Sequence, residues 1–136
     1  MVRTILVVDD ERHVARVLTV ALERAGYTVE TARNGEEAVI KLVELKPDAL
    51  LTDIMMPRMN GRELVALVCN QFPERPVPIV VMTSSLELEH RDWVKNYSDL
   101  HFIEKPVSPR RIIQILDKYF SATDIDEPGH ESLRTV

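Results

Sequence analysis

The sequence predicts an α/β fold with a doubly wound parallel sheet of five strands and five helices. Short apolar runs alternate along the chain with segments of helical periodicity, a pattern typical of a parallel sheet that helices cover on both faces. Three runs are almost wholly apolar, as expected of strands buried on both faces: Ile5–Val8, Ala49–Thr52 and Ile79–Met82. A chain of 136 residues fits one domain of this kind and can bury a normal core.

The first two strand–helix units have distinct patterns. After the strand Ile5–Val8, a helix is expected from Glu11 to Ala25, where Gly26 ends it. Its apolar residues share one face: Val14, Val17, Leu18, Ala21, Leu22 and Ala25. Tyr27–Thr31 alternates apolar with polar residues, which suits an edge strand. A second helix follows the turn at Asn34-Gly35, with an inner stripe of Ala38, Val39, Leu42 and Val43.

The rest of the chain repeats the alternation. Prolines separate several of the elements, as expected of residues that cannot continue a helix or a central strand. The elements expected are a strand at Ala49–Thr52, a helix after Gly61, a strand at Ile79–Met82, a weakly amphipathic helix at Leu86–Tyr97, a strand at Leu100–Ile103, and a helix from Pro109 to about Ser121.

The domain is expected to occupy residues 1–121. Residues 122–136 are polar and lack a periodic apolar face, so a flexible tail or the start of a linker is expected there. A net charge of −5 argues against direct nucleic-acid binding. The single cysteine, Cys69, excludes an internal disulfide and is expected on a buried helix face. Since no apolar run is long enough for a signal or a membrane span, a cytoplasmic location is expected.

Polar side chains follow four of the five expected strands. Asp9 and Asp10 come after the first, Asp53 after the third, Thr83 after the fourth and Lys105 after the fifth. In an open parallel sheet, ligands bind outside the carboxyl ends of the strands. We therefore expect these five side chains to meet at one edge of the sheet.

Each residue type has a chemical use at such an edge. Three crowded carboxylates repel one another unless a cation neutralises them, and oxygen ligands favour a hard cation such as Mg²⁺. A carboxylate can also be a nucleophile that forms an aspartyl phosphate. Phosphoryl transfer then needs positioning and charge neutralisation, which Mg²⁺ and a lysine supply. A threonine hydroxyl can donate to a phosphate oxygen that exists only after transfer.

Each residue also has a structural alternative. Asp9 or Asp10 could cap the first helix, Asp53 could be an ordinary loop carboxylate, and Thr83 a turn residue. Lys105 before a proline could be a solvated surface charge. All of these alternatives would have to hold together at one edge of one sheet, so the combination favours a phosphoryl-transfer site.

Five motifs in order resemble the receiver domains of two-component response regulators, including the chemotaxis regulators. They are Val7–Glu11, Leu51–Pro57, Met59–Gly61, Met82–Ser84 and Glu104–Pro106. The resemblance extends from about Thr4 to Ser121. It implies a flavodoxin-like sheet with strand order 2-1-3-4-5.

The resemblance also implies the roles of the acidic residues and the lysine. Asp53 is similar to the family's phosphoacceptor, and Asp9 and Asp10 to the acid pair that holds Mg²⁺ with it. The third metal contact in the family is a backbone carbonyl, which here belongs to Met55. Lys105 is similar to the lysine that pairs with the phosphate, so Asp53, Lys105 and Thr83 form the implied catalytic set.

A second group of residues resembles the family's switch. Thr83 matches the switch hydroxyl and Phe102 the switch aromatic, although Phe102 could also be a plain core residue. Ser84 is small, as the family requires beside the acceptor, while Met55 and Ser85 occupy positions that influence how long the phosphate lasts. The resemblance implies a cis bond between Lys105 and Pro106.

The function implied is a phosphoacceptor switch rather than an enzyme, with only self-catalysed phosphoryl transfer and autodephosphorylation. A sensor histidine kinase or a phosphotransfer protein would supply the phosphoryl group from a phospho-His. Phosphorylation would change the surface of the fourth helix and fifth strand, and so regulate an unknown partner or an attached output domain. The alternatives are a degenerate receiver that acts without phosphate, and a Mg²⁺-dependent phosphatase, whose Asp-x-Asp motif is missing after the first strand.

Overall fold

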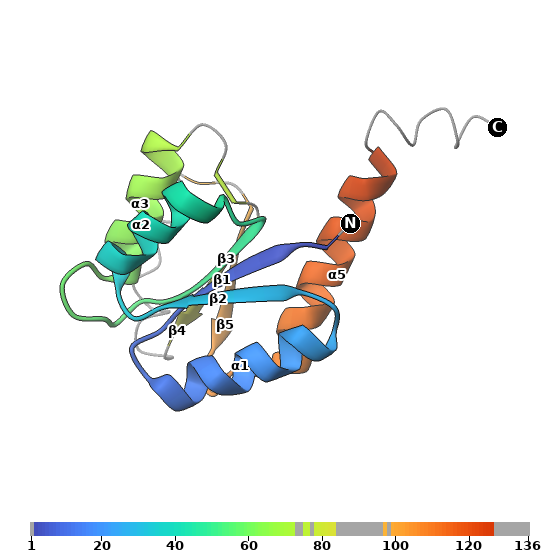
Figure 1. The fold of residues 1–136 in the computed structure, drawn as a ribbon, viewed down its shortest axis with the longest axis horizontal. Coiled ribbons are helices and arrows are strands. Elements are labelled where there is room, and N and C mark those ends of the chain that lie inside the picture. The colour runs from blue at the N-terminus through green and yellow to red at the C-terminus, as the bar shows by residue number, and fades with distance from the viewer. Residues whose placement is uncertain (1, 73–74, 77, 84–96, 98, 127–136) are drawn as a thin grey trace.

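A five-stranded parallel sheet forms the centre of the protein (Figure 1). The computed structural model describes residues 2–72, 75–76, 78–83, 97 and 99–126. The strands lie in the order β2-β1-β3-β4-β5, which confirms the predicted order. Their bounds are Thr4–Val8 for β1, Thr28–Ala32 for β2, Ala49–Asp53 for β3, Ile79–Thr83 for β4 and Leu100–Glu104 for β5.

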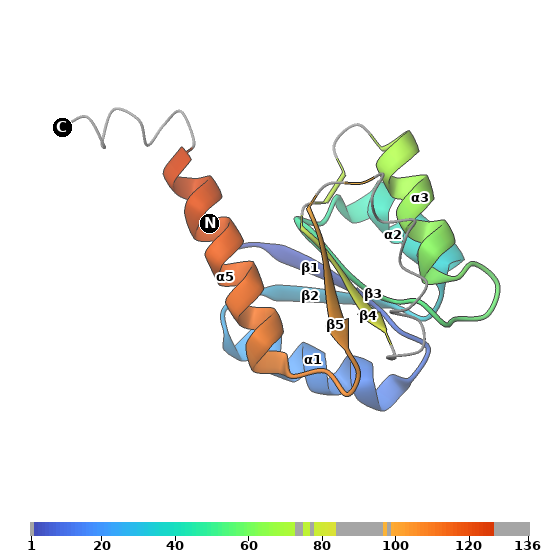
Figure 2. The same ribbon diagram turned by 180° about the vertical axis from the view of Figure 1, so that it is seen from behind.

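Four helices are described, and they cover both faces of the sheet. Their bounds are Arg12–Arg24 for α1, Gly35–Leu45 for α2, Gly61–Gln71 for α3 and Pro109–Asp126 for α5. Helices α1 and α5 lie on one face and α2 and α3 on the other, as the two opposite views show (Figures 1 and 2). The helix expected at Leu86–Tyr97 lies outside the described residues except for Tyr97, and so do Ser84 and Ser85.

The central strands explain why the sequence forms two separate cores. Every residue of β3 and β4 is buried, as the almost continuous apolar runs predict. Successive side chains point to opposite faces, so Leu6 and Leu50 pack with α2 and α3 while Val7 and Leu51 pack with α1 and α5. The edge strand β2 is only partly buried, in keeping with its alternating sequence.

Three apolar residues expected on inner helix faces lie at the surface instead, and one of them, Ala25, directly follows the end of α1. Val17 of α1 is 55% exposed and Val43 of α2 is 61% exposed. Each valine is adjacent in sequence to a leucine that fills the core, Leu18 or Leu42. One residue step turns a helix by about 100°, so in α1 and α2 the leucine faces the sheet and its valine neighbour points away from it.

Helix α5 is longer than the sequence pattern indicates. It continues to Asp126, past the expected end at Ser121. Phe120 is buried, and Ser121 and Ala122, which follow it, are exposed. The helix therefore continues past the stretch with a periodic apolar face. Sequence periodicity detects only that stretch, so it placed the end of the helix too early. None of the described helices has the length and apolar composition needed to span a membrane.

Candidate phosphoryl-transfer site

The register of the sheet brings the predicted site residues to one edge. Val8 pairs with Thr52, so Asp9, which directly follows β1, lies beside the end of β3, where Asp53 is the last residue. Thr83 is the last residue of β4 and pairs with Glu104 of β5. Lys105 follows directly, and its backbone N–H donates to the Thr83 carbonyl at 2.7 Å.

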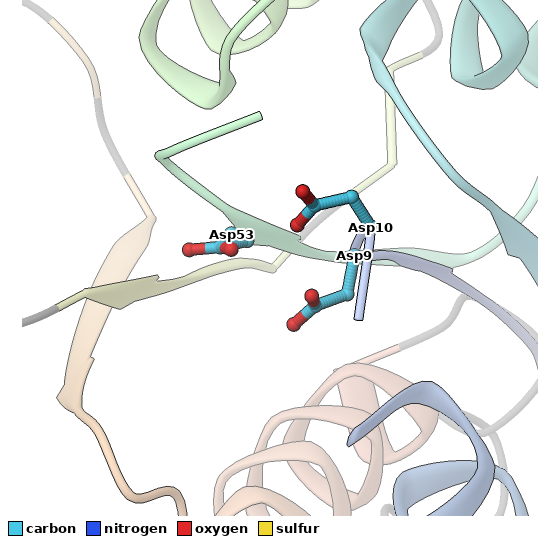
Figure 3. Close-up of side chains that lie close together, drawn as sticks. All are labelled: Asp9, Asp10 and Asp53. Atoms are coloured by element: carbon cyan, nitrogen blue, oxygen red, sulfur yellow. The ribbon is translucent and has the colours of Figure 1, made fainter. Parts of the chain in front are cut away.

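Three aspartates form an acidic cluster at this edge (Figure 3). Carboxylate oxygens of Asp9, Asp10 and Asp53 all lie within 4.8 Å of one another. Asp9 and Asp53 are nearly inaccessible, with 2% and 5% of their surface exposed, whereas Asp10 is exposed. This set of oxygen donors fits a hard divalent cation, which would offset the repulsion among the three charges.

Lys105 provides a positive charge against this cluster. Its Nζ lies 3.1 Å from Asp53 Oδ2 and 3.5 Å from Asp9 Oδ2. A third carboxylate, that of Glu11, lies 3.5 Å from the same nitrogen. Burial lowers the pKa of Lys105, but the hydrogen bond to Asp53 and the three negative charges outweigh it, so the pKa of the ammonium is raised.

The environment of the buried carboxylates favours their neutral form. Desolvation is the largest effect and raises the pKa of both Asp9 and Asp53 above the ordinary value. Lys105 and the backbone N–H groups of Ile54 and Met55 oppose this rise at Asp53. At Asp9, the backbone N–H of Glu11 opposes it, donating to Oδ1 at 2.9 Å. A raised carboxyl pKa beside a cation partner is typical of functional sites.

The backbone around Asp53 is held by close contacts with the start of α3. Gly61 donates its N–H to the Ile54 carbonyl at 2.8 Å. A Cβ at Gly61 would lie 2.1 Å from the Asp53 carbonyl oxygen, so only glycine fits there. Asn60 and Glu63 form a reciprocal capping box that begins α3. The motif Met59–Gly61 marked this segment in the sequence, but this contact could not be read from it.

A cavity of about 360 Å³ opens over the acceptor. It is lined by Asp10, Glu11, Asp53, Ile54, Met55, Thr83 and Lys105. Thr83 is 1% exposed and reaches this cavity from β4, whereas the Met55 side chain is 64% exposed. Four of the predicted site residues therefore share one space with the acceptor, large enough for a phosphoryl group.

Phe102 lies on β5 opposite Val81, partly buried against the core on the α2–α3 side. This position suits a packing role and a switch role equally, so the switch role stays a prediction.

The peptide bond between Lys105 and Pro106 is cis, as the resemblance implied. Cys69 lies in α3, partly buried against the same core, and desolvation raises the pKa of its thiol.

A larger groove of about 720 Å³ lies between α1 and α2 along β2, but its chemistry is ordinary. Two of its cations have acidic partners: Arg33 pairs with Glu37, which also lines the groove, at 3.7 Å, and Lys41 pairs with Glu30 at 4.0 Å. Of the predicted site residues, only Asp9 borders it. Cavity size alone would therefore have selected this groove rather than the cavity over Asp53 as the candidate site.

Comparison with known proteins agrees with the motifs. A family model described as the response regulator receiver domain matches residues 5–117. The transcriptional regulatory protein ResD of Bacillus subtilis is 39% identical over 110 residues, which are 80% of this chain and 44% of ResD. The response regulator MprA of Mycobacterium ulcerans is 43% identical over 125 residues, which are 90% of this chain and 52% of MprA. The chain spans about half the length of these curated relatives.

Among solved structures, the chemotaxis response regulator CheY4 of Vibrio cholerae is similar. It has a TM-score of 0.75 and 30% sequence identity, and the match covers 87% of this chain and 98% of that one. The relatives thus include a chemotaxis regulator matched over nearly its whole length and transcriptional regulators matched over about half of theirs.

Proposed function

The chain belongs to the response regulator receiver family, and from this premise we propose that Asp53 accepts a phosphoryl group and thereby switches the surface of the domain. The observation that carries the proposal is the position of the Asp53 carboxylate, 3.1 Å from the Lys105 ammonium and within one acidic cluster with Asp9 and Asp10. Receiver domains of two-component systems are signalling switches rather than turnover enzymes.

The reaction would use the carboxylate as a nucleophile. An oxygen of Asp53 forms a bond to the phosphorus of a phospho-His donor, while the P–N bond breaks and its electron pair leaves with the imidazole. Lys105 stands where it can pair with a phosphoryl oxygen. Self-catalysed attack of water on the aspartyl phosphate would later return free phosphate and the Asp53 carboxylate, which resets the switch.

The residues that would hold Mg²⁺ are Asp9, Asp10, Asp53 and the backbone carbonyl of Met55. Bound there, the ion would neutralise charge on the phosphoryl oxygens during transfer. The raised carboxyl pKa values of Asp9 and Asp53 support this role, because buried carboxylates that resist ionisation gain from a nearby cation.

The donor would be a sensor histidine kinase or a phosphotransfer protein. An apolar groove of about 230 Å³ opens beside Lys105 and supports docking of a partner next to the acceptor. Its lining comes from α1 and from the segment after β5: His13, Val14, Val17, Leu18, Lys105, Pro106 and Val107. Val17 is exposed, so under this proposal its side chain would provide apolar contact area to the docked partner.

The downstream change would pass through Thr83 and Phe102. The new phosphoryl oxygens would draw the Thr83 hydroxyl toward them, and Phe102 could then turn inward. The fourth helix of the predicted output surface lies outside the described residues, whereas β5 is described. Because relatives such as ResD are about twice as long, the partner could be an attached output domain or a separate protein.

Phosphoryl uptake tests the proposal directly. Incubated with a small acyl phosphate and Mg²⁺, the protein is expected to gain the mass of one phosphoryl group. With EDTA in excess of the metal, uptake should fall to background, because only Lys105 would then offset the charge of three clustered carboxylates that face an anionic donor. Intact-mass spectrometry measures both results. A protein that takes up no phosphoryl group under either condition is a phosphate-independent module, and one that steadily releases phosphate at enzymatic rates is a phosphatase.

Thr83→Ala is expected to separate uptake from switching. The variant should accept the phosphoryl group, because Asp53 and Lys105 are intact, but lose the structural response in β5. Hydrogen–deuterium exchange of the β5 amides, compared with and without phosphorylation, measures that response. Thr83→Ser keeps the hydroxyl and is the matched control. If Thr83→Ala shows the same exchange change as the serine variant, Thr83 is no part of the switch.

A further inference from the structure

Glu11 occupies the N-cap position of α1 but does not use its side chain as a cap. Its backbone is extended, with φ −90° and ψ 107°, as N-cap residues are. Within the described part of the chain, no side-chain capping bond forms there. The carboxylate borders the acceptor cavity instead, where Oε1 lies 3.5 Å from Lys105 Nζ, while Oε2 lies 3.8 Å from Nε2 of the exposed His13. The capping preference of the position therefore does not explain this residue.

Lys105 is shared among three carboxylates of different character. Asp53 is the nearest at 3.1 Å, and Asp9 and Glu11 both lie at 3.5 Å. Asp9 and Asp53 are buried, whereas half of the Glu11 side chain is exposed, so Glu11 draws the ammonium toward the solvent side. An ammonium has three N–H donors and can divide them among these partners.

Removing the charge of Glu11 would change the position of the Lys105 ammonium among its carboxylate partners. Two of its three anionic partners would remain, and both belong to the acidic cluster. The ammonium would then neutralise Asp53 and Asp9 more completely. A divalent cation at the same carboxylates would meet less negative charge and bind more weakly.

We propose that Glu11 is a positioning residue that draws Lys105 toward the mouth of the cavity and thereby keeps Asp9 and Asp53 available to Mg²⁺. The inference rests on the proposed metal site of the phosphoacceptor. It assigns to Glu11 an effect on resting-state metal affinity that is separate from the chemistry of transfer.

The test is a Mg²⁺ titration of the unphosphorylated protein, followed by the NMR shifts of backbone amides at the sheet edge. Glu11→Gln keeps the size of the side chain and removes its charge. We expect its Mg²⁺ dissociation constant to rise about two- to fivefold at low salt, and the difference to shrink as salt increases. Glu23→Gln, an exposed position in the last turn of the same helix, removes the same charge away from the site and is expected to bind as wild type does.

A double-mutant cycle distinguishes action through Lys105 from a direct effect of charge. In the Lys105→Met background, Glu11→Gln is expected to change Mg²⁺ affinity little, since the side chain that Glu11 positions is gone. An equal fold-change in both backgrounds overturns the positioning role, and so does equal affinity of wild type and Glu11→Gln. A wild type that binds no Mg²⁺ overturns the proposed metal site together with this inference, so the two failures are distinguishable.

Discussion

Asp53→Asn is expected to abolish phosphoryl uptake from an acyl phosphate in the presence of Mg²⁺. An amide oxygen is a poor nucleophile and carries no charge for the metal, while its shape matches the carboxylate that it replaces. Intact mass after incubation should remain that of the unmodified variant, a loss of at least about a hundredfold in rate. The side chain is 5% exposed, lies against Lys105 and lines the cavity, so the substitution removes the proposed nucleophile from the centre of the site.

The matched control is Asp99→Asn. Asp99 directly precedes β5, at the opposite edge of the sheet from the acceptor, and its φ of 60° is one that asparagine tolerates well. This variant should gain one phosphoryl group as wild type does. Phosphoryl uptake by Asp53→Asn at the rate of the control would place the acceptor elsewhere.

Asp53→Asn is also expected to change the stability of the protein. The pKa of Asp53 is raised in the folded protein, chiefly by desolvation, so folding favours its neutral form. The stabilising contribution is then present below the unfolded-state pKa and is lost as pH rises through the folded-state pKa. At neutral pH without Mg²⁺, Asp53→Asn should therefore have the higher free energy of unfolding. Urea denaturation should show this gain at pH 7 and its disappearance in acid; a less stable variant at pH 7 would contradict the argument.

Gly61→Ala is expected to damage both stability and phosphoryl uptake. Its Cβ would lie 2.1 Å from the Asp53 carbonyl oxygen and 2.8 Å from the Ile54 Cα, and backbone atoms cannot rotate away as a side chain can. We expect a loss of about 3 kcal/mol in the free energy of unfolding. Because the displaced backbone carries the acceptor, uptake should slow at least about tenfold even in the folded fraction. Urea denaturation and the initial rate of uptake measure the two effects.

Gly26→Ala is the control that separates these effects. Gly26 has a φ of 100°, so alanine is strained there, but nothing lies within 4 Å of the new Cβ. The expected cost is about 1–2 kcal/mol of stability with an unchanged rate of uptake. If Gly61→Ala likewise lost only stability, the contact with Asp53 would not be what positions the acceptor.

The sequence predicted the fold well because the signals that specify it are local. Buried strands appear as apolar runs, and the residue that follows each run locates the carboxyl edge of the sheet. Asp53 could be placed beside Asp9 on this basis, since parallel strands end at the same edge. The strand order came from the resemblance, and the register of the sheet confirms it.

What the sequence could not predict depends on distance and orientation. Val17 and Val43 satisfy helical periodicity, yet the core needs only their neighbours, and the sequence does not show where a sheet surface ends. The direction of the Glu11 side chain is a choice of rotamer that depends on Lys105, which lies 94 positions later in the chain. The contact between Gly61 and the Asp53 carbonyl is a matter of tenths of an ångström, which residue types alone do not encode.

The register of β3 has a consequence for how such a protein can change over time. Leu50 pairs with Ile79 and Asp53 with Met82, and alternate side chains of β3 fill two different cores. A slip by one residue would send each core's side chains to the wrong face, so both layers of packing hold the acceptor in place. Apolar residues on either face can therefore be exchanged for others of similar volume while Asp53 keeps its position. Substitutions in the two cores can therefore accumulate during evolution without moving the site residues at the edge of the sheet.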